Sequence, residues 1–252
     1  MNIITGLPRA GSTLLCNILN QNPKNFASDT SILAGAVQAV ITSVSEQLEA
    51  QDLPYEVLKN MVMGVINAKY PELADRTVYD KGRLWTRMGL QYQDLKLGKM
   101  FVLVRDLRDV YASMERAHRK NPLLAPSHLI SSNDVFTRAD LMFSPEGMVG
   151  SCVAGIEDLI RRDLDNVVFI QYEKLVTDPE TMMKQFDDFE YQFDDVINVA
   201  NENDKAYMGK YPHNGSGKVT GKSINSWKGL INDDLAQMIQ ARFPLYTKTF
   251  GY

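Results

Sequence analysis

A glycine-rich loop near the N-terminus has the residue types and the spacing needed to bind an anion. The segment from Gly6 to Thr13 reads GLPRAGST, and it lies between a short apolar run and a helical pattern. Its two glycines allow the backbone to curl so that successive N–H groups point inward, and the helix that follows adds about half a positive charge at its N-terminus. Such a nest of N–H groups binds a phosphate or a similar oxyanion. A plain strand–turn–helix corner is the structural alternative.

The loop departs at one position from the phosphate-binding pattern of nucleoside triphosphatases. That pattern is G-x-x-x-x-G-K-[ST], and its lysine reaches the β- and γ-phosphates. Here Ser12 stands in the place of the lysine, and a cation appears earlier in the loop, at Arg9. The difference argues against triphosphate hydrolysis and leaves the prediction of an anion site intact.

A second segment also carries groups suited to a phosphate. The apolar run from Phe101 to Val104 predicts a strand buried on both faces, which ends at Arg105 and is followed by a helix that bears Ser113. Ligands of α/β proteins bind outside the carboxyl ends of such strands. An arginine guanidinium can hold a phosphate through two parallel hydrogen bonds.

Together the two segments resemble the family of sulfotransferases that use 3′-phosphoadenosine-5′-phosphosulfate (PAPS). Its members carry P-[KR]-[SA]-G-[ST]-T for the 5′-phosphosulfate and R-D-P-R-x-x-x-x-S for the 3′-phosphate. This sequence has PRAGST at positions 8–13 and RDLR at 105–108, followed by Ser113, with Leu107 in place of the usual proline. The resemblance implies these cofactor-binding residues: Pro8, Arg9, Ala10, Gly11, Ser12, Thr13, Arg105 and Ser113.

The resemblance extends over nearly the whole chain. QYEKL at 171–175, DPE at 178–180 and the ending FGY look like segments of the same family, and residues 121–145 are the least similar. The arginine in the loop and the segment LNQNP at 19–23 are most similar to the tyrosylprotein sulfotransferases and related bacterial enzymes. The resemblance therefore implies transfer of a sulfuryl group from PAPS to an acceptor hydroxyl or amine, with release of PAP.

A second catalytic cation is expected after the predicted strand at 77–79. The family places a lysine there, near the bridging oxygen of PAPS, and Lys81 matches it. A solvated charge at the end of a strand is the alternative for a lone lysine. By the same resemblance, Arg9 and the loop amides would meet the charge that develops on the leaving 5′-phosphate, where preorganised donors are most effective.

The general base is less clearly marked. The cytosolic branch of the family uses a histidine soon after the lysine, but residues 82–85 contain none. The tyrosylprotein branch uses a glutamate before a threonine, and this sequence offers Asp29 before Thr30, shifted by one residue. We expect Asp29 to be the base, with a helix cap near Ser31 as its alternative role. His118 is a weaker candidate for the base.

Two further groups are expected at the nucleotide. The glycine-rich, locally basic segment 214–222 resembles a family loop that closes over the 3′-phosphate, and either Lys218 or Lys222 can contribute the cation; we prefer Lys222. A flexible surface loop is the alternative. Tyr172 can stack on the adenosine or hydrogen-bond to it, and a role in core packing is nearly as well supported.

Composition limits the remaining possibilities. The chain has 252 residues, a formal net charge of −4 and two cysteines. This charge provides no general attraction for nucleic acid or for an anionic membrane. The two cysteines are too few for a disulfide framework, and no cluster of residues suggests a metal site, which sulfuryl transfer does not require. Without a signal-like or membrane-spanning run we expect a soluble cytoplasmic enzyme whose sulfate acceptor the sequence does not define. A nucleotide or small-molecule kinase and a non-catalytic nucleotide-binding relative are the alternatives.

Alternating strands and helices place these residues on one α/β domain, residues 1–252, with a P-loop-like parallel sheet flanked by helices. We expect residues 121–145 to form a surface loop or lid and the acidic residues between 187 and 195 to form a solvated face. The expected strands are 3–5, 77–79, 100–104 and 167–171, and the expected helices are 12–21, 31–50, 54–68, 84–95, 107–119, 147–162, 178–189 and 232–243.

Overall fold

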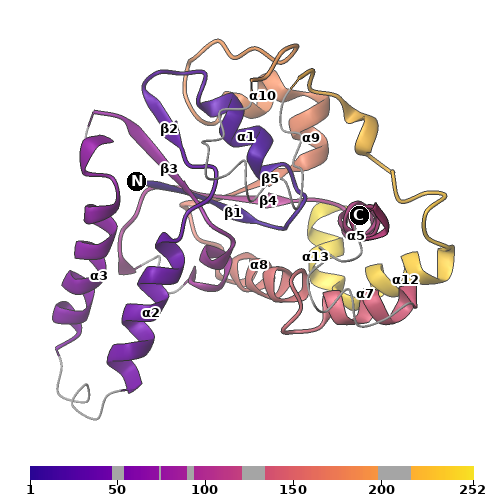
Figure 1. Cartoon of the computed structure of the whole chain (residues 1–252), viewed down its shortest axis with the longest axis horizontal. Coiled ribbons are helices and arrows are strands. Elements are labelled where there is room, and N and C mark those ends of the chain that lie inside the picture. Colours follow the sequence, from indigo (N-terminus) through magenta and orange to yellow (C-terminus); the bar gives the residue numbers. More distant parts are fainter. Residues whose placement is uncertain (47–53, 74, 90–93, 121–133, 198–216) are drawn as a thin grey trace.

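A five-stranded parallel sheet forms the centre of the protein (Figure 1). The computed structural model describes residues 1–46, 54–73, 75–89, 94–120, 134–197 and 217–252. The strands follow the order β2-β3-β1-β4-β5 across the sheet, and every neighbouring pair is parallel. This confirms the predicted α/β fold. The strands are β1 (Asn2–Gly6), β2 (Asn25–Ala27), β3 (Thr77–Lys81), β4 (Met100–Val104) and β5 (Val167–Gln171).

The extent to which a strand is buried depends on its place in the sheet. All five residues of β4 are buried, as the continuous apolar run predicts. The apolar run at 167–171 also predicts a buried strand, but this was wrong, because in β5 Ile170 alone is buried. This strand pairs only with β4 and forms an edge of the sheet, so neighbouring segments cover it incompletely.

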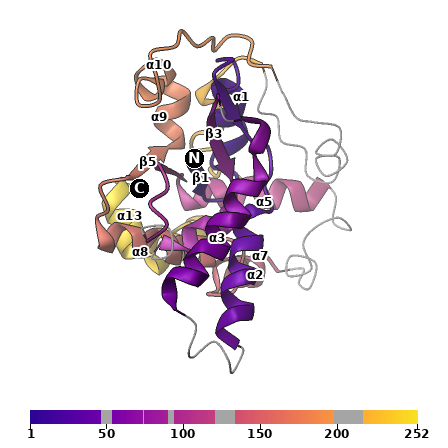
Figure 2. The ribbon, with the colours of Figure 1, turned by 90° about the vertical axis from the view of Figure 1, so that its left-hand side faces the viewer.

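Helices cover both faces of the sheet. In the view of Figure 1, α1, α9 and α10 lie above it and α8 lies below, while α5, α7 and α12 gather beyond the end of β4. In Figure 2, α2 and α3 lie in front of the sheet and project downward as a pair. The helices are α1 (Ser12–Leu19), α2 (Leu33–Glu46), α3 (Tyr55–Lys69), α5 (Leu107–Lys120), α7 (Val135–Phe143), α8 (Gly150–Arg162), α9 (Tyr172–Thr177), α10 (Pro179–Met183), α12 (Asp233–Arg242) and α13 (Pro244–Phe250). No helix within the described ranges is both long and apolar enough to cross a membrane.

The pattern of the sequence missed several elements. The described part of the expected loop at 121–145 contains α7, whose first turn is capped because Asp134 accepts a hydrogen bond from the amide of Thr137; residues 121–133 lie outside the described ranges. The helix expected at 84–95 begins instead as a 3₁₀ helix, Arg83–Arg87, held by the Thr86 hydroxyl, which donates to the carbonyl of Arg83. The helix expected at 178–189 ends at Met183, and α9 and α13 were not foreseen.

The short strand β2 was also missed because side chains rather than an apolar pattern define it. The Asn20 amide donates to the carbonyl of Ala27 at 2.8 Å and accepts from its N–H at 2.7 Å. The Asp187 carboxylate accepts from the side chains of Asn25 and Tyr191, both at 2.8 Å. These bonds lower the pKa of Asp187, although partial burial opposes the shift. The prediction of a purely solvated acidic face was therefore wrong at Asp187, which fastens β2 to the segment after α10.

A close approach between β1 and β4 requires the glycine that begins the loop. Gly6 has a φ of 119°, and a Cβ placed there would lie 2.2 Å from the carbonyl oxygen of Leu103. The N–H of Leu7 donates to the same oxygen at 2.9 Å. Any larger residue at position 6 must therefore push the loop away from the edge of the sheet.

Replacing Gly6 by alanine should lower the free energy of unfolding by about 2–4 kcal/mol, because the new Cβ meets backbone and the φ is unfavourable. Urea denaturation measures this. Gly64→Ala in α3 is the matched control: nothing lies within 4 Å of its added Cβ, and it should stabilise by about 0.5–1 kcal/mol. Equal stabilities of the two variants would contradict the proposed clash.

Candidate functional site

Each of the five strands ends in a residue or loop that the sequence predicted to be functional. Asp29 follows β2, Lys81 ends β3, the loop 6–13 follows β1, Arg105 follows β4 and Tyr172 follows β5. The carboxyl ends of parallel strands lie on the same edge of a sheet. The strand order therefore arranges these groups in a row, which at the usual strand spacing is about 19 Å long from β2 to β5.

The loop has the curled backbone that its glycines predict. Gly11 has a φ of 87° and Arg9 a φ of 62°, so two residues just before α1 are left-handed. Alternation of left-handed and right-handed residues turns successive N–H groups toward one side, which is the geometry of an anion-binding nest. The guanidinium of Arg105 donates to the carbonyl of Arg9 at 2.7 Å and fixes this conformation from the neighbouring strand.

Tyr172 packs directly against the loop and against Arg105. A Cβ at Gly11 would lie 2.7 Å from the Tyr172 ring, so the second glycine of the loop is needed for this contact. The guanidinium carbon of Arg105 lies 4.2 Å from the ring centroid, and the hydroxyls of Tyr172 and Ser223 are 2.5 Å apart. Tyr172 thus joins the loop to residue 223, and its contact with an adenosine stays a prediction.

Arg105 is buried, and hydrogen bonds fix both its terminal nitrogens and its backbone. Its Nη2 donates to the carbonyl of Ser223 at 2.8 Å, and the Asp109 carboxylate lies 4.0 Å away. The Tyr246 hydroxyl accepts from the Arg105 N–H at 3.0 Å and donates to its carbonyl at 2.8 Å. The Nε of Arg105 is buried and has no hydrogen-bond partner among the described residues, so it is a donor that a bound anion can use.

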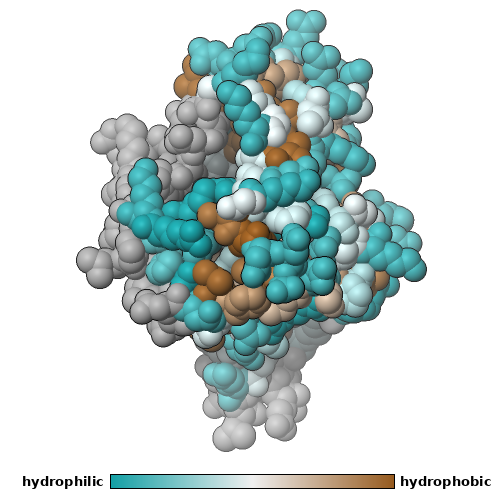
Figure 3. Space-filling view, turned by 90° about the vertical axis from the view of Figure 1, so that its right-hand side faces the viewer, coloured by the Kyte–Doolittle hydropathy of each residue, from teal (hydrophilic) through white to brown (hydrophobic). Residues whose placement is uncertain are grey.

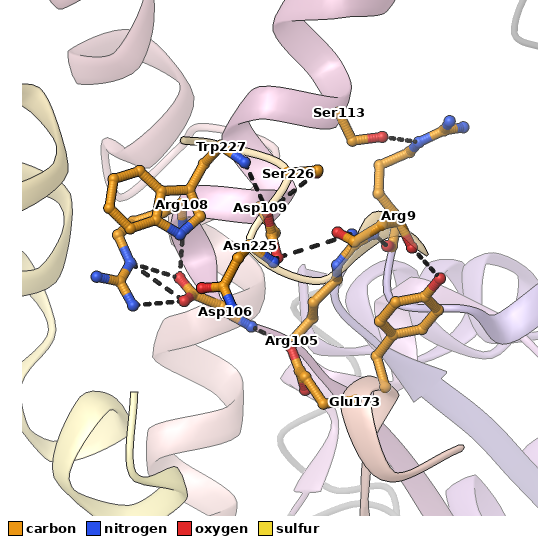
Figure 4. Close-up of polar contacts among 12 residues, drawn as sticks. Arg9, Arg105, Asp106, Arg108, Asp109, Ser113, Glu173, Asn225, Ser226 and Trp227 are labelled. Atoms are coloured by element: carbon orange, nitrogen blue, oxygen red, sulfur yellow. Dashed lines mark hydrogen bonds and ion pairs between the residues drawn. The ribbon is translucent and has the colours of Figure 1, made fainter. Parts of the chain in front are cut away.

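The side chain of Arg9 reaches from the loop to α5. Its Nε donates to the Ser113 hydroxyl at 2.9 Å (Figure 4). Burial lowers the pKa of Arg9, and the positive charges of Arg105 and Arg116 lower it further. Crowded guanidinium groups of this kind are relieved by an anion placed among them, so the donor set fits a phosphate ligand.

Lys81 lies on the other side of the loop. Its Nζ donates to the Thr13 hydroxyl at 3.3 Å, and its backbone N–H donates to the Ser28 hydroxyl at 2.8 Å. The N–H of Ser31 in turn donates to the Lys81 carbonyl at 3.0 Å. Asp29 therefore lies in a short segment that is bonded to Lys81 both before and after it.

The pKa of the Cys16 thiol in α1 depends on the charged groups of the site. Burial raises the pKa of its thiol to about 11, while Lys81 opposes the shift and Asp29 adds to it. The charges of Lys81 and Asp29 therefore both act on the Cys16 thiol. Lys81 ends β3 and Asp29 follows β2, so both lie at the same end of the row of groups. The Ser31 hydroxyl accepts from the N–H of Leu33 in the first turn of α2, so a capping bond at this helix comes from Ser31.

The buried carboxylate of Asp80, the residue before Lys81, fixes the end of β3 through two hydrogen bonds. Asp80 accepts a hydrogen bond from the Tyr70 hydroxyl at 2.6 Å and another from the Trp85 indole at 2.9 Å. Burial and the neighbouring Asp80 raise the pKa of Tyr70. Asp80 and its two donors fix the end of β3 and hence the starting point of the Lys81 side chain.

A second segment, here called the strap (Ser223, Ile224, Asn225, Ser226 and Trp227), lies against α5. The Asp109 carboxylate accepts from the N–H of Asn225 at 2.8 Å, the N–H of Trp227 at 2.9 Å and the hydroxyl of Ser226 at 3.0 Å (Figure 4). Sequence reasoning missed Asp109, although it lies one helical turn after Arg105. One carboxylate thus positions the strap whose residue Ser223 bonds to Arg105.

The structure gives Lys218, Lys222 and His118, the remaining candidate residues, different surroundings. Lys218 forms an exposed ion pair with Asp194 at 2.7 Å, whereas Lys222 is exposed directly before Ser223 of the strap. His118 lies near the C-terminal end of α5, and its Nδ1 is buried without a partner among the described residues. Residues 214–216 of the glycine-rich segment lie outside the described ranges. No group of three or more potential metal ligands occurs in the described part of the chain.

The face beside α5 and α12 is mostly hydrophilic, with apolar side chains gathered near its centre (Figure 3).

Asp109, Arg116 and Tyr246 contact the groups of this site, and the sequence did not reveal them. Their contacts join segments that lie more than a hundred residues apart, so spacing along the chain gave no signal of them.

Comparisons with known proteins agree with the geometry. A family model described as "Sulfotransferase domain" matches residues 2–244. The structure of the sulfotransferase domain from the Synechococcus PCC 7002 olefin synthase is 19% identical, with a TM-score of 0.57, and the match covers 100% of this chain and 94% of that one. The sulfotransferase domain from the curacin biosynthetic pathway is 17% identical, with a TM-score of 0.58 and 96% of each chain covered. Mouse sulfotransferase SULT7A1 complexed with PAP is 12% identical, with a TM-score of 0.54 and coverage of 98% and 84%. No curated protein matches the chain.

Removing the Tyr246 hydroxyl should loosen Arg105. Tyr246→Phe leaves a buried N–H and a buried carbonyl without their bond, so the free energy of unfolding should fall by about 1–3 kcal/mol. Urea denaturation measures the change. Tyr55→Phe, which removes a hydroxyl that hydrogen-bonds to Asp94 at a side chain that is 54% exposed, is the control and should lower the free energy of unfolding by no more than about 0.5 kcal/mol. Equal stability of Tyr246→Phe and the wild type would show that the hydroxyl does not hold Arg105.

Proposed function

The chain belongs to the sulfotransferase domain family, whose members transfer a sulfuryl group from PAPS, and from this premise we propose how its residues divide that work. The observation that carries the proposal is the row of groups at the carboxyl edge of the sheet, from Asp29 through the loop 6–13 to Tyr172. In this proposal the row follows the length of the nucleotide, with the acceptor at the β2 end and the adenosine at the β5 end.

The loop 6–13 holds the 5′-phosphosulfate. Its backbone N–H groups and the N-terminus of α1 provide partial positive charge without an ion pair. PAPS supplies a sulfuryl group on a phosphate leaving group, and displacement leaves negative charge on that phosphate. Residues 8–13, PRAGST, bind this group, and the curled backbone around Arg9 and Gly11 supports the assignment. Donors fixed in advance stabilise developing charge without reorganisation.

Lys81 is the cation on the acceptor side of the loop. Its contact with Thr13 supports a position beside the reacting group, and the bonds of its backbone with Ser28 and Ser31 keep the end of β3 in place. The ammonium stabilises negative charge on the bridging oxygen as the bond to sulfur breaks. Arg9 contributes a second charge from the nucleotide side of the loop.

Asp29 accepts the proton of the acceptor. Its segment is bonded to Lys81 on both sides, and a capping bond at α2 already comes from Ser31. The acceptor hydroxyl, or amine, would lie between Asp29 and the loop. The helix α2 begins directly beyond this point and carries no charged residue before Glu46, so it would give the acceptor an uncharged wall.

The 3′-phosphate lies at the N-terminal half of α5. Ser113 and the free Nε of Arg105 bind it in this proposal, Lys222 closes over it from the position directly before the strap, and Tyr172 contacts the adenosine. The kinase alternative is not favoured, because Ser12 stands where a triphosphate-binding lysine is needed. No metal is required by this division of roles.

Binding of nucleotides should separate the proposed function from the kinase alternative. PAP should raise the melting temperature of the protein well beyond ADP at the same concentration, because only PAP carries a 3′-phosphate for Ser113 and Arg105. Thermal shift assays with PAP, ADP and ATP–Mg²⁺ measure this. A larger shift with ATP–Mg²⁺ than with PAP would contradict the proposal.

Asp29→Asn should lower kcat for sulfate transfer from PAPS by about 10²–10⁴-fold, the usual effect of losing a general base. The affinity for PAP should change by less than about threefold, because the proposed base acts on the acceptor in the transition state and not on the bound nucleotide. Transfer of labelled sulfate and calorimetric titration measure the two quantities.

Asp165→Asn removes an exposed carboxylate before β5 and serves as the control. If Asp29→Asn instead lowers the melting temperature and leaves kcat nearly unchanged, the carboxylate has a structural role and not a catalytic one.

A further inference from the structure

A tyrosine directly after α3 contacts the two strands that lead to Asp29 and Lys81. The Tyr70 hydroxyl donates to the Asp80 carboxylate in β3 at 2.6 Å, and its ring centroid lies 5.6 Å from that of Phe26 in β2. Asp29 follows β2, and β3 ends at Lys81. Tyr70 therefore lies beside the chain that leads to both groups, although the proposed function gives it no role.

The segment between β2 and α2 carries Asp29 and is bonded to the end of β3. The N–H of Ser28 donates to the carbonyl of Tyr79 at 3.0 Å. The N–H of Ser31 donates to the carbonyl of Lys81, also at 3.0 Å. These two bonds hold the main chain on both sides of Asp29.

The hydroxyls of the same two serines reach Tyr70. The Ser28 hydroxyl accepts from the N–H of Lys81 at 2.8 Å, so its own proton is left for a further bond. The Ser31 hydroxyl accepts from the N–H of Leu33 at 3.1 Å and likewise keeps its proton. Burial and the neighbouring carboxylate raise the pKa of Tyr70, and hydrogen bonds with the two serine hydroxyls oppose the rise. The Tyr70 oxygen thus joins serines that lie before and after the proposed base.

The carboxylate that accepts from Tyr70 is itself fixed. Asp80 is buried, and its other oxygen accepts from the indole N–H of Trp85 at 2.9 Å. A hydrogen bond to a carboxylate is stronger than one between neutral groups, so it defines the place of the Tyr70 oxygen well. Because Asp80 directly precedes Lys81, this oxygen connects the segment of Asp29 to the start of the Lys81 side chain.

The separation of Asp29 and Lys81 matters for the proposed reaction, because the acceptor oxygen must lie between the base and the sulfuryl group. Misplacement of reacting groups by about 1 Å can lower a rate by about 10²-fold. We propose that Tyr70 is a positioning residue for the transfer, which holds Asp29 at a fixed place relative to Lys81 and does not itself touch PAPS or the acceptor. This inference rests on the proposed function.

Transfer of sulfate from labelled PAPS to water tests the inference without an identified acceptor. In this reaction water gives its proton to Asp29 as its oxygen bonds to sulfur, and the bond from sulfur to the 5′-phosphate oxygen breaks, which releases sulfate and PAP. Tyr70→Phe keeps the ring beside Phe26 and removes the hydroxyl. It should lower kcat by about tenfold or more. The Kd for PAP, measured by calorimetric titration, should change by less than about twofold.

Tyr191→Phe is the matched control. The Tyr191 hydroxyl also donates to a carboxylate, that of Asp187, at 2.8 Å, and this carboxylate holds the opposite end of β2 through Asn25. Both variants should lower the melting temperature, because each takes a donor away from a carboxylate. Tyr191→Phe should nevertheless leave kcat and the Kd for PAP within about twofold of the wild-type values.

A double-mutant cycle shows whether Tyr70 acts through Asp29. In the Asp29→Asn background, Tyr70→Phe should lower kcat by less than about twofold, because the base that it positions is already lost. A tenfold loss in both backgrounds would show that Tyr70 acts on another part of the site, and it would overturn the inference.

The other outcomes also separate the possibilities. Unchanged kcat in Tyr70→Phe would overturn the inference, and so would equal losses of kcat in Tyr70→Phe and Tyr191→Phe. If Asp29→Asn alone leaves kcat unchanged, the assignment of the base fails and the inference fails with it. A wild-type protein that binds PAP but releases sulfate no faster than buffer does would contradict the proposed function itself.

Discussion

The buried guanidinium of Arg105 holds together the segments on which the site depends. It fixes the carbonyl of Arg9 in the loop, the carbonyl of Ser223 in the strap and the ring of Tyr172 after β5. Its own backbone is held by the hydroxyl of Tyr246. Loop, strap and edge strand are distant in the sequence, so one charged group at the end of β4 determines how they meet. The energetic cost of burying that charge is offset by its hydrogen bonds and by Asp109.

The same arrangement explains how an acidic chain can bind an anionic nucleotide. The net charge of −4 is spread over the whole protein, whereas at the site Arg9, Arg105 and Arg116 lie close enough together for the other two charges to lower the pKa of Arg9. Local groups dominate over distant ones because salt screens charges beyond about 10 Å. The order of the strands also gives the site a direction, since Asp29, the proposed base, and Lys81 follow β2 and β3, whereas Arg105 follows β4 on the other side of the loop.

The sequence predicted the parts of the site that depend on local chemistry. Gly6, Lys81 and Arg105 lie at or directly after the ends of strands, and Gly11 lies directly before α1, so residue type and strand pattern together predict their positions. The roles of Asp109 and Arg116 were hidden because they depend on the strap, which comes to α5 from more than a hundred residues away. The strand β2 was hidden for a similar reason, since side chains from Asn20 and Asp187 hold three residues with no apolar repeat.

A crystal structure of the protein with PAP would test the central claim most directly, which is that the order of the strands sets the direction of the nucleotide. In that complex we expect the 5′-phosphate against the backbone N–H groups of the loop 6–13, the 3′-phosphate beside Ser113 and the adenosine toward Tyr172. A nucleotide bound in the opposite direction, with its 3′-phosphate beside Lys81, would contradict the account. Binding at any place other than the carboxyl edge of the sheet would contradict it too.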